Sequence, residues 1–465
     1  MNAAQTATSL PDTIDIYLTD LKSDLTVLLE SNRENLSFEE TEKQLHAAFI
    51  EVEKKVIRDL MSQYDIDVPL FYMDGEKYRR VIRSNNTYMS CAGSVQLQRS
   101  LYRANGQKET ICPMELGAGI IESHWTPKAA KQALHLVSQL TPYEAEKVFC
   151  ELGGMNPSKS SLDRLPKKLG RQWEANKEGL ELTLREMQKI PAEAVALAVS
   201  LDGVLIPMQG GRILPGDSRY EEASCGTVTY YNESGEPLLT RRHGCMPEHK
   251  KKTMKSFLKA EVDYALEQQP ALRLVKVADG AKDNWRFLDE ALPKGVSVLD
   301  FYHAAEHLKS AFDLVYAKDD IKSRVEFNRY HSLLRHDPKG IDKVIKVLAR
   351  LVKKYPAKKL LLTELNYFKN NKERCRYYSI AENNLPIGSG IVEATCKTLV
   401  TQRLKRSGMC WGMEGGQSIL TFRSLLQSKL FDPAWAELSE KYKTKIRLPD
   451  NVVLLEGYRE KIVRA

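Results

Sequence analysis

Apolar and polar residues recur along the chain with two different periods, and the change of period separates its regions. From Phe38 to Tyr64 the apolar residues have near-helical spacing, which predicts an amphipathic helix whose stripe consists of Leu45, Phe49, Val52, Val56 and Leu60. From Thr87 to Arg103 the residues partly alternate, and Ala92-Gly93 marks a turn. We therefore predict a mostly helical region over residues 1–85 and a small β-hairpin or ribbon over residues 86–125.

A helical period returns after residue 125 in short segments. Thr126-Pro127 has the pattern of an N-cap followed by proline, and Pro142–Leu152 forms a second helix that Gly153-Gly154 ends. Ser158 caps a third helix, which Pro166 is expected to interrupt, and residues 171–190 follow the pattern of a long, charged linker helix.

This succession of helix, glycine turn and helix fits a helix-turn-helix, so residues 126–190 are predicted to be a DNA-binding region with its linker. In that arrangement Lys159, Ser160 and Arg164 face the major groove. A plain three-helix bundle has the same pattern and remains the alternative.

Strands and helices alternate from residue 194 onward. In chain order we expect strands over residues 194–202, 224–231 and 236–242, a helix over 249–268, a strand over 272–278, a helix over 283–292 and a strand over 296–299. This order predicts an α/β fold, α+β overall, with a mixed sheet flanked by helices.

A basic helical insertion is predicted over residues 304–385. Within it, apolar residues from Ile341 to Leu351 form a stripe opposite lysines and arginines, a pattern that a solvated helix face also gives. Residues 191–303 and 386–435 are expected to form the two parts of one domain around this insertion, and residues 436–465 a tail.

Composition narrows the class of protein. The chain has 465 residues, of which 42% are hydrophobic and 28% charged, and its formal net charge of +8 allows a polyanionic partner. It has no apolar stretch long enough for a membrane span and no signal peptide, so we expect a cytoplasmic protein without a membrane partner. The eight cysteines form no CxxC pair, which argues against a zinc knuckle or a redox motif.

Two aspartates stand where predicted strands end. Asp202 and Asp279 are each followed by glycine, and side chains at the carboxyl ends of neighbouring strands emerge at one edge of a sheet. Two close carboxylates repel each other unless a cation such as Mg²⁺ neutralises them. The alternative is an ordinary Asp-Gly turn without a ligand.

Glu393 is the third notable acid. It follows Gly388-Ser389-Gly390, which lacks the Walker pattern of an NTPase, and it precedes a basic helical segment with Lys397, Arg403, Lys405 and Arg406. A carboxylate that completes a metal site within a phosphate-attracting segment indicates a nucleic-acid enzyme.

These motifs resemble bacterial insertion-sequence transposases of the Kra group. The resemblance covers about residues 195–435. It rests on Asp202-Gly203, on Asp279-Gly280 and above all on Ile387–Lys397, and the segment Arg403–Trp411 strengthens it. Cys410 departs from the pattern, because the group is expected to have arginine at this position. The segment from Asp300 to His303 also resembles the D-x-x-H motif of Mutator-like transposases.

The resemblance implies the DDE superfamily, whose catalytic domain is RNase H-like. Asp202, Asp279 and Glu393 would hold two Mg²⁺ ions, which Mn²⁺ can replace. A water-derived hydroxide would cleave a phosphodiester at the transposon end, and the resulting 3′ hydroxyl would attack target DNA. One partner would be double-stranded DNA, both the terminal inverted repeats and the target. The other would be a second copy of the chain, in a homodimer or larger synaptic complex. The protein would be nucleoid-associated when it is bound to DNA.

Two single residues have open alternatives. His303 would orient the scissile phosphate or a flanking base, or make a structural hydrogen bond, and its spacing from Asp300 and His307 also allows a metal site. Trp411 would stack on an unpaired base or lie in the core. For the whole chain, the alternatives to a transposase are a metal-dependent nuclease without strand transfer and a domesticated, non-catalytic DNA-binding protein.

Overall fold

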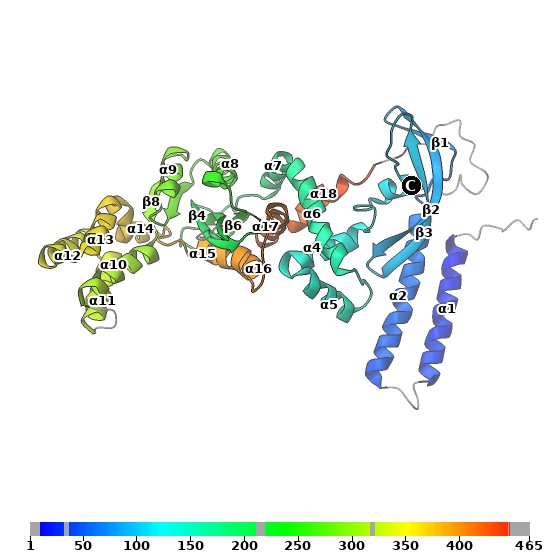
Figure 1. Cartoon of the computed structure of the whole chain (residues 1–465), viewed down its shortest axis with the longest axis horizontal. Coiled ribbons are helices and arrows are strands. Elements are labelled where there is room, and N and C mark those ends of the chain that lie inside the picture. Colours follow the sequence, from blue (N-terminus) through cyan, green and yellow to red (C-terminus); the bar gives the residue numbers. More distant parts are fainter. Residues whose placement is uncertain (1–9, 32–36, 211–218, 317–320, 445, 447–465) are drawn as a thin grey trace, which may run out of the picture. The chain divides into compact units, whose positions relative to one another are not determined.

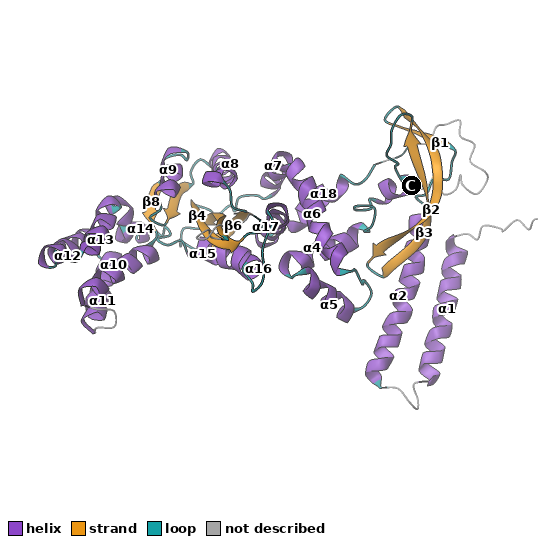
Figure 2. Ribbon diagram, in the orientation of Figure 1, coloured by secondary structure: helices purple, strands orange, loops and turns teal. Residues whose placement is uncertain are grey.

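The chain folds into two compact units, which we call the N-terminal unit and the sheet unit. The computed structural model describes residues 10–31, 37–210, 219–316, 321–444 and 446. The N-terminal unit comprises residues 1–173 and 434–465, and the sheet unit comprises residues 174–433. Figure 1 labels the elements and Figure 2 separates helices from strands. The seven predicted segments are finer than this division, and their boundaries stay predictions.

The N-terminal unit begins with a hairpin of two helices, α1 (Leu10–Ser31) and α2 (Phe38–Ser62). The side chain of Ser37 caps α2 by accepting a hydrogen bond from the backbone N–H of Glu40. The Tyr17 hydroxyl lies 2.5 Å from an Asp59 carboxylate oxygen and ties α1 to α2. Helix α2 confirms the helix predicted from Phe38.

The mostly helical region predicted over residues 1–85 is wrong beyond Ser62. Strand β1 (Leu70–Met73) pairs with β2 (Glu76–Ser90), and the buried rings of Phe71 and Tyr78 stack across the pair at 5.3 Å. Apolar packing between two short segments therefore overrides their weak helical period.

The predicted ribbon is confirmed and is longer than expected. Strand β2 pairs with β3 (Gly93–Ala104) in the antiparallel sheet β1-β2-β3, and Ser90 lies opposite Gly93 at the turn. Gly93 has a φ of +105°, a conformation that favours glycine.

Helices follow the ribbon in this unit. Their bounds are α3 (Pro113–Ala118), α4 (Pro127–Gln139), α5 (Pro142–Leu152), α6 (Lys159–Ala175), which ends just past the unit boundary, and α18 (Phe431–Glu440), which begins just before it. Helix α5 matches its prediction: Thr141 and Glu144 form a capping box, and Gly153 ends the helix with a φ of +73°.

Helix α6 corrects two expectations. It passes through Pro166 without interruption, because Pro166 is buried on the same apolar face as Leu162, Leu165 and Leu169, and this burial offsets the lost backbone hydrogen bond. The chain then breaks at Asn176 before α7 (Lys177–Met187), so residues 171–190 are not one continuous linker helix.

The sheet unit contains the predicted mixed sheet. The strand order is β6-β5-β4-β7-β8; β5 is antiparallel to β4 and β6, whereas β7 is parallel to β4 and β8. The strands are β4 (Ala196–Pro207), β5 (Tyr220–Tyr231), β6 (Pro237–Cys245), β7 (Arg273–Ala278) and β8 (Val296–Leu299).

Alternation along the strands sends side chains to both faces of the sheet. Leu197, Val199 and Leu201 pack with α8 (Lys252–Gln268) and α9 (Lys282–Glu290). Ala196 and Ala198 face the other way, into the core that the helical insertion covers.

The insertion is helical, as predicted. Its helices are α10 (Phe301–Tyr316), α11 (Ile321–His336), α12 (Gly340–Lys354), α13 (Lys359–Asn370) and α14 (Tyr377–Ala381). In α12 the apolar stripe is buried and the lysines are exposed.

The chain returns to the sheet through a second helical run. This run consists of α15 (Gly390–Thr395), a π-helical turn (Cys396–Thr401), α16 (Gln402–Leu404) and α17 (Met413–Gln427). Within the described part of the chain, no helix is long and apolar enough to cross a membrane.

Candidate active site

Strand β4, which carries Asp202, pairs with β7, which ends one residue before Asp279. The two parallel strands pair with a constant offset of 77 residues, from Ala196 opposite Arg273 to Ser200 opposite Val277. The pairing ends two residues before each aspartate: Asp202 continues β4, whereas Asp279 follows the end of β7 and accepts hydrogen bonds from the Ala281 backbone and the Asn284 side chain, both at 3.1 Å. Sequence analysis expected β4 to end at Asp202; instead the strand continues to Pro207, because residues 203–207 pair with the start of β5.

The glycine after each aspartate has a packing reason. A Cβ at position 203 would overlap the Glu222 carboxyl, and a Cβ at position 280 would lie 2.5 Å from the Tyr367 ring. Gly203 lies inside a strand, so the turn alternative is wrong for Asp202. Both glycines allow another side chain to approach the backbone beside an acid.

Asp300 is the most buried acid of this sheet edge. It is 0% exposed and directly follows β8. Its Oδ1 accepts the backbone N–H of His303 at 2.7 Å and lies 3.0 Å from His303 Nδ1, while its Oδ2 accepts the backbone N–H of Ser389. Burial by itself would raise the pKa of Asp300, but these hydrogen bonds outweigh it and lower the pKa below its usual value.

Glu393 is carried to the same place by the loop before α15. The Ser389 hydroxyl donates to Glu393 Oε1 at 2.8 Å, while the backbone of the same serine binds Asp300. On the same helical run, the Cys396 thiol lies 3.6 Å from Asp202 Oδ2. Ser389 and Cys396 therefore link the helical run of Glu393 to Asp202 in β4 and to Asp300 just after β8.

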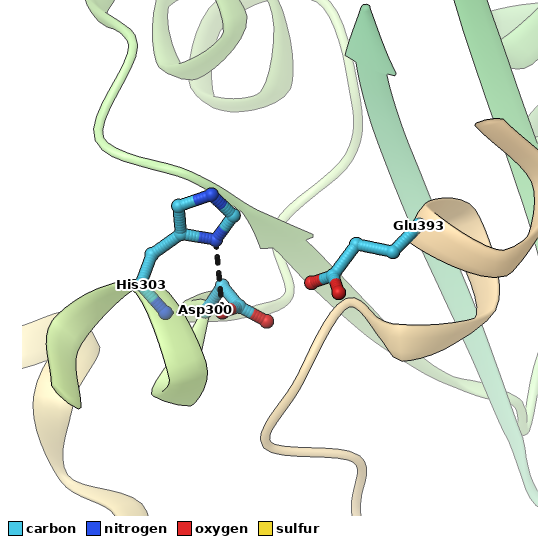
Figure 3. A group of neighbouring side chains, drawn as sticks. All are labelled: Asp300, His303 and Glu393. Atoms are coloured by element: carbon cyan, nitrogen blue, oxygen red, sulfur yellow. Dashed lines mark hydrogen bonds and ion pairs between the residues drawn. The ribbon is translucent and has the colours of Figure 1, made fainter. Parts of the chain in front are cut away.

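Figure 3 shows the Glu393 carboxylate directed toward the Asp300–His303 pair. One ligand atom from each of these three residues lies within 4.8 Å of the other two, a spacing that allows one metal ion to be held. Among the described residues no other such group of three occurs, so Asp202, Asp279 and Glu393 are not gathered as closely. The predicted triad is neither confirmed nor excluded by this and stays a prediction.

We call Asp202, Asp279, Asp300 and Glu393 the acid edge. Within the described ranges, none of these four carboxylates forms an ion pair with lysine or arginine; the one ion pair is between Asp300 and His303. The hydrogen bond to Asp300 raises the pKa of His303 to about 9, so the imidazole carries a positive charge at neutral pH and in that state is not a metal ligand. One positive charge does not balance four carboxylates.

Asp300 is not among the acids that the sequence predicts to be catalytic. The signal that could have identified it is the one that selected Asp279: an aspartate directly after a buried strand. The possible metal set of Asp300, His303 and His307 is corrected in one member. His307 Nδ1 lies 2.6 Å from Glu364 and its ring stacks on Tyr367, whereas Glu393 lies beside Asp300 and His303.

The predicted DNA-contacting residues have different surroundings. Lys159, Ser160 and Arg164 are exposed at the start of α6 in the N-terminal unit, as a groove-reading helix requires. In the sheet unit, Lys397, Lys405 and Arg406 are exposed. These positions are compatible with DNA contact but do not test it.

Arg403 is the exception and corrects its prediction. Its side chain is buried, at 2% exposure, and its guanidinium lies 5.1 Å from the centre of the Trp411 ring, so it has a packing role. Trp411 is half-buried, and its indole N–H donates to the Leu404 carbonyl at 2.8 Å. The backbone of Trp411 also bonds to Pro207 and Gln209 at the end of β4, which favours the structural alternative for this tryptophan.

Comparison with known proteins adds one finding. Among solved structures the chain is similar to the Drosophila P element transposase strand transfer complex, with a sequence identity of 12% and a TM-score of 0.26. The match covers 69% of this chain and 82% of that chain. None of the protein-family models and none of the curated proteins compared with the chain matches it. A TM-score this low carries no argument, so the resemblance to the Kra group stays a prediction from the sequence.

Proposed function

We propose that this chain is a DNA transposase of the DDE type, which cleaves phosphodiester bonds at transposon ends and joins the ends to target DNA. The observation that carries the proposal is the acid edge, where four carboxylates lack a lysine or arginine partner among the described residues. Close carboxylates destabilise a fold unless a cation neutralises them. The residue pattern from Ile387 to Lys397 supports the same activity through its resemblance to insertion-sequence transposases.

The donor atoms of the acid edge suit a hard divalent cation. Carboxylate oxygens are the ligands that Mg²⁺ prefers, and Mn²⁺ accepts the same set. We assign Asp202, Asp279 and Glu393 to two such ions, as the resemblance implies. A divalent cation at this edge would lower the pKa of the attacking water or hydroxyl and neutralise charge on the phosphate.

The residues of the chain itself supply the rest of the chemistry. Asp300 has both carboxylate oxygens occupied by hydrogen bonds, so it positions the loop that carries Glu393. His303, positively charged and half-exposed, is a donor at the same edge and would orient the scissile phosphate. Positioning and charge stabilisation are the main contributions that phosphoryl transfer requires from a protein.

The DNA partner is double-stranded. The exposed Lys397 on the helical run of Glu393, together with Lys405 and Arg406, would bind backbone phosphates near the acid edge. Lys159, Ser160 and Arg164 on α6 would read the terminal inverted repeats in the major groove.

The test is a cleavage and joining reaction with Mg²⁺ and DNA that contains a transposon end. The unmodified chain should nick the end and then join it to a second DNA. Asp202→Asn, Asp279→Asn and Glu393→Gln should each lower the cleavage rate by at least about 10²- to 10³-fold while still binding the end. Asp263→Asn, which changes a half-exposed acid paired with Lys259 on α8, is the matched control and should cleave normally.

Each other outcome has a definite meaning. Cutting without joining would make the chain a nuclease, and binding without cutting would make it a non-catalytic DNA-binding protein. Normal cleavage by Asp202→Asn or Glu393→Gln would contradict the assignment of the acid edge.

A further inference from the structure

Helix α2 has more apolar surface than its own unit covers. One face, with Ile50, Ile57 and Met61, lies against the ribbon side of the unit: Met61 is buried, Ile57 packs against a cluster with Tyr88 and Val95 of the ribbon, and Ile50 approaches Gly154. A second face contacts α1, where Lys55 pairs with Asp20 at 3.1 Å. These two faces account for the packing of α2 within the N-terminal unit.

A third face of α2 is apolar and exposed. Phe38 is 76%, Leu45 39%, Phe49 51% and Leu60 46% exposed, and the half-buried Val56 lies between them on the same side of the helix. We call Phe38, Leu45, Phe49, Val56 and Leu60 the α2 stripe. The side of α2 opposite the stripe is polar, with Glu40, Gln44, Glu51, Arg58 and Ser62. The exposed apolar residues are therefore a continuous line along one side of the helix and mark an interaction surface.

The spacing of the α2 stripe is self-complementary. Positions 45, 49, 56 and 60 are symmetric about a point between Val52 and Glu53, because Leu45 and Leu60 lie equally far from it, as do Phe49 and Val56. In a two-fold symmetric contact, residue i touches residue j of the partner and residue j touches residue i. Two antiparallel copies of α2 would thus place Leu45 of one against Leu60 of the other and Phe49 against Val56, whereas Phe38 lies outside this symmetric set because its counterpart, position 67, is beyond the end of α2.

We propose that the α2 stripe is the dimerisation surface of this protein and that its occupant is the α2 stripe of a second copy, antiparallel about an axis near Val52. The paired α1–α2 hairpins then form a four-helix arrangement, a common way to bury such faces. The proposal is independent of the catalytic one, because it concerns a surface of the N-terminal unit and is tested without DNA.

The first experiment measures the mass of the full chain in solution by light scattering. The unmodified protein should be a dimer, and the double variant Phe49→Glu, Val56→Glu should be a monomer with an unchanged circular dichroism spectrum. Ala47→Glu, on the polar side of α2, is the matched control and should remain a dimer. A monomeric unmodified protein, or a double variant that stays dimeric, would overturn the proposal.

A second experiment tests the direction of pairing and does not depend on how the glutamates affect folding. In a background where Cys91, Cys150 and Cys410, the cysteines that are not buried, are serine, a cysteine is introduced at one position and oxidised. Glu53→Cys, next to the axis, should form a disulfide-linked dimer, and Glu40→Cys should not. Leu45→Cys should also fail, because antiparallel pairing separates the two copies of residue 45 by about 22 Å along the helix. Efficient cross-linking at residue 45 would mean a parallel dimer and contradict the symmetric contact.

Discussion

Both units of the molecule bring carboxylates to a sheet, and they differ in what neutralises them. In the N-terminal unit, the partly buried Glu115 pairs with Arg99 and accepts a hydrogen bond from Tyr88 at 2.6 Å. Asp65 and Asp67 lie beside Arg83, at 3.2 and 2.8 Å. At the acid edge of the sheet unit, the described residues offer His303 alone as a positive ion-pair partner.

The difference separates acids that the described part of the chain neutralises with arginine from acids that it leaves without an arginine or lysine partner. A buried carboxylate with its own arginine is satisfied inside the fold, and removing the arginine leaves an uncompensated charge. Carboxylates without such a partner keep a negative charge that a cation from solution can neutralise. The following predictions test this contrast, from the largest expected effect to the smallest.

The ribbon acids should depend on their arginines for stability. Arg99→Leu leaves Glu115 partly buried without its cation, and we expect the N-terminal unit to lose about 3 kcal/mol of unfolding free energy. Urea-induced unfolding of the full chain measures this loss. Arg103→Leu, an exposed arginine on the same strand, is the control and should change stability little. Equal losses of stability from the two substitutions would contradict the idea that Glu115 depends on Arg99.

The acid edge should instead depend on a cation from solution. Under the proposed assignment Mg²⁺ binds the folded edge and not the unfolded chain, so Mg²⁺ at about 100 times its dissociation constant should stabilise the sheet unit by about 2.7 kcal/mol. Thermal unfolding with increasing Mg²⁺ measures the rise in melting temperature. Glu393→Gln and Asp279→Asn should abolish most of the rise, and Asp263→Asn should keep it. No rise with the unmodified chain would mean that these acids hold no such ion in the absence of DNA.

A buried histidine of the sheet unit should make that unit sensitive to acid. Burial lowers the pKa of His243 well below its usual value, and the nearby cations Lys177, Arg241 and Arg185 lower it further. The folded state therefore binds fewer protons than the unfolded state, so stability is complete above about pH 6.5 and falls below it, by at most about 1.4 kcal/mol per pH unit.

His243→Phe tests this directly, since a phenyl ring can keep the stacking on Phe257 that the imidazole makes at 3.9 Å. Urea unfolding between pH 7 and pH 5 should show a weaker pH dependence for this variant than for the unmodified chain. His336→Phe, an exposed histidine of the same unit, should leave the dependence as it was. An unchanged slope in His243→Phe would show that acid acts elsewhere.

The smallest effect concerns the cations of the N-terminal unit that we assign to DNA. Lys159→Ala with Arg164→Ala should weaken binding to the transposon end and lower the salt slope of log K by about 2, because each phosphate contact contributes about 0.9. A gel-shift titration at several salt concentrations gives this slope. Lys147→Ala on α5, whose ammonium lies over the Tyr143 ring, is the control. Unchanged affinity in the double variant would contradict the helix-turn-helix assignment.

Local patterns predicted the elements of this fold well. The bounds of α5 and β8 follow from a capping residue, glycines and a short apolar run, all of which act within a few residues. The order of strands and helices gave the mixed sheet, because short connections limit how such elements combine. The burial of the α12 stripe was predictable for the same reason.

The failures involve contacts between distant residues. Arg403 lies among basic residues in the sequence, and the return of Trp411 to the end of β4 brings the indole ring against its side chain. The length of β4 depends on residues 220–224 as its partner, which the pattern of β4 alone does not contain. The helical period of α2 is real, but a period does not reveal which neighbour covers each face, and so the residues of its predicted stripe are largely exposed.

The two hydrogen bonds that connect the acid edge join residues far apart in the sequence, so the edge can be complete only late in synthesis of the chain. The Ser389–Asp300 bond spans 89 residues and the Cys396–Asp202 contact spans 194, whereas the last strand of the sheet ends at Leu299. At about 5–20 residues per second, a ribosome reaches Glu393 roughly 5–20 s after it has finished that strand. All five strands of the sheet are therefore synthesised before Glu393. Premature termination within the insertion would release a protein that has these strands but lacks Glu393.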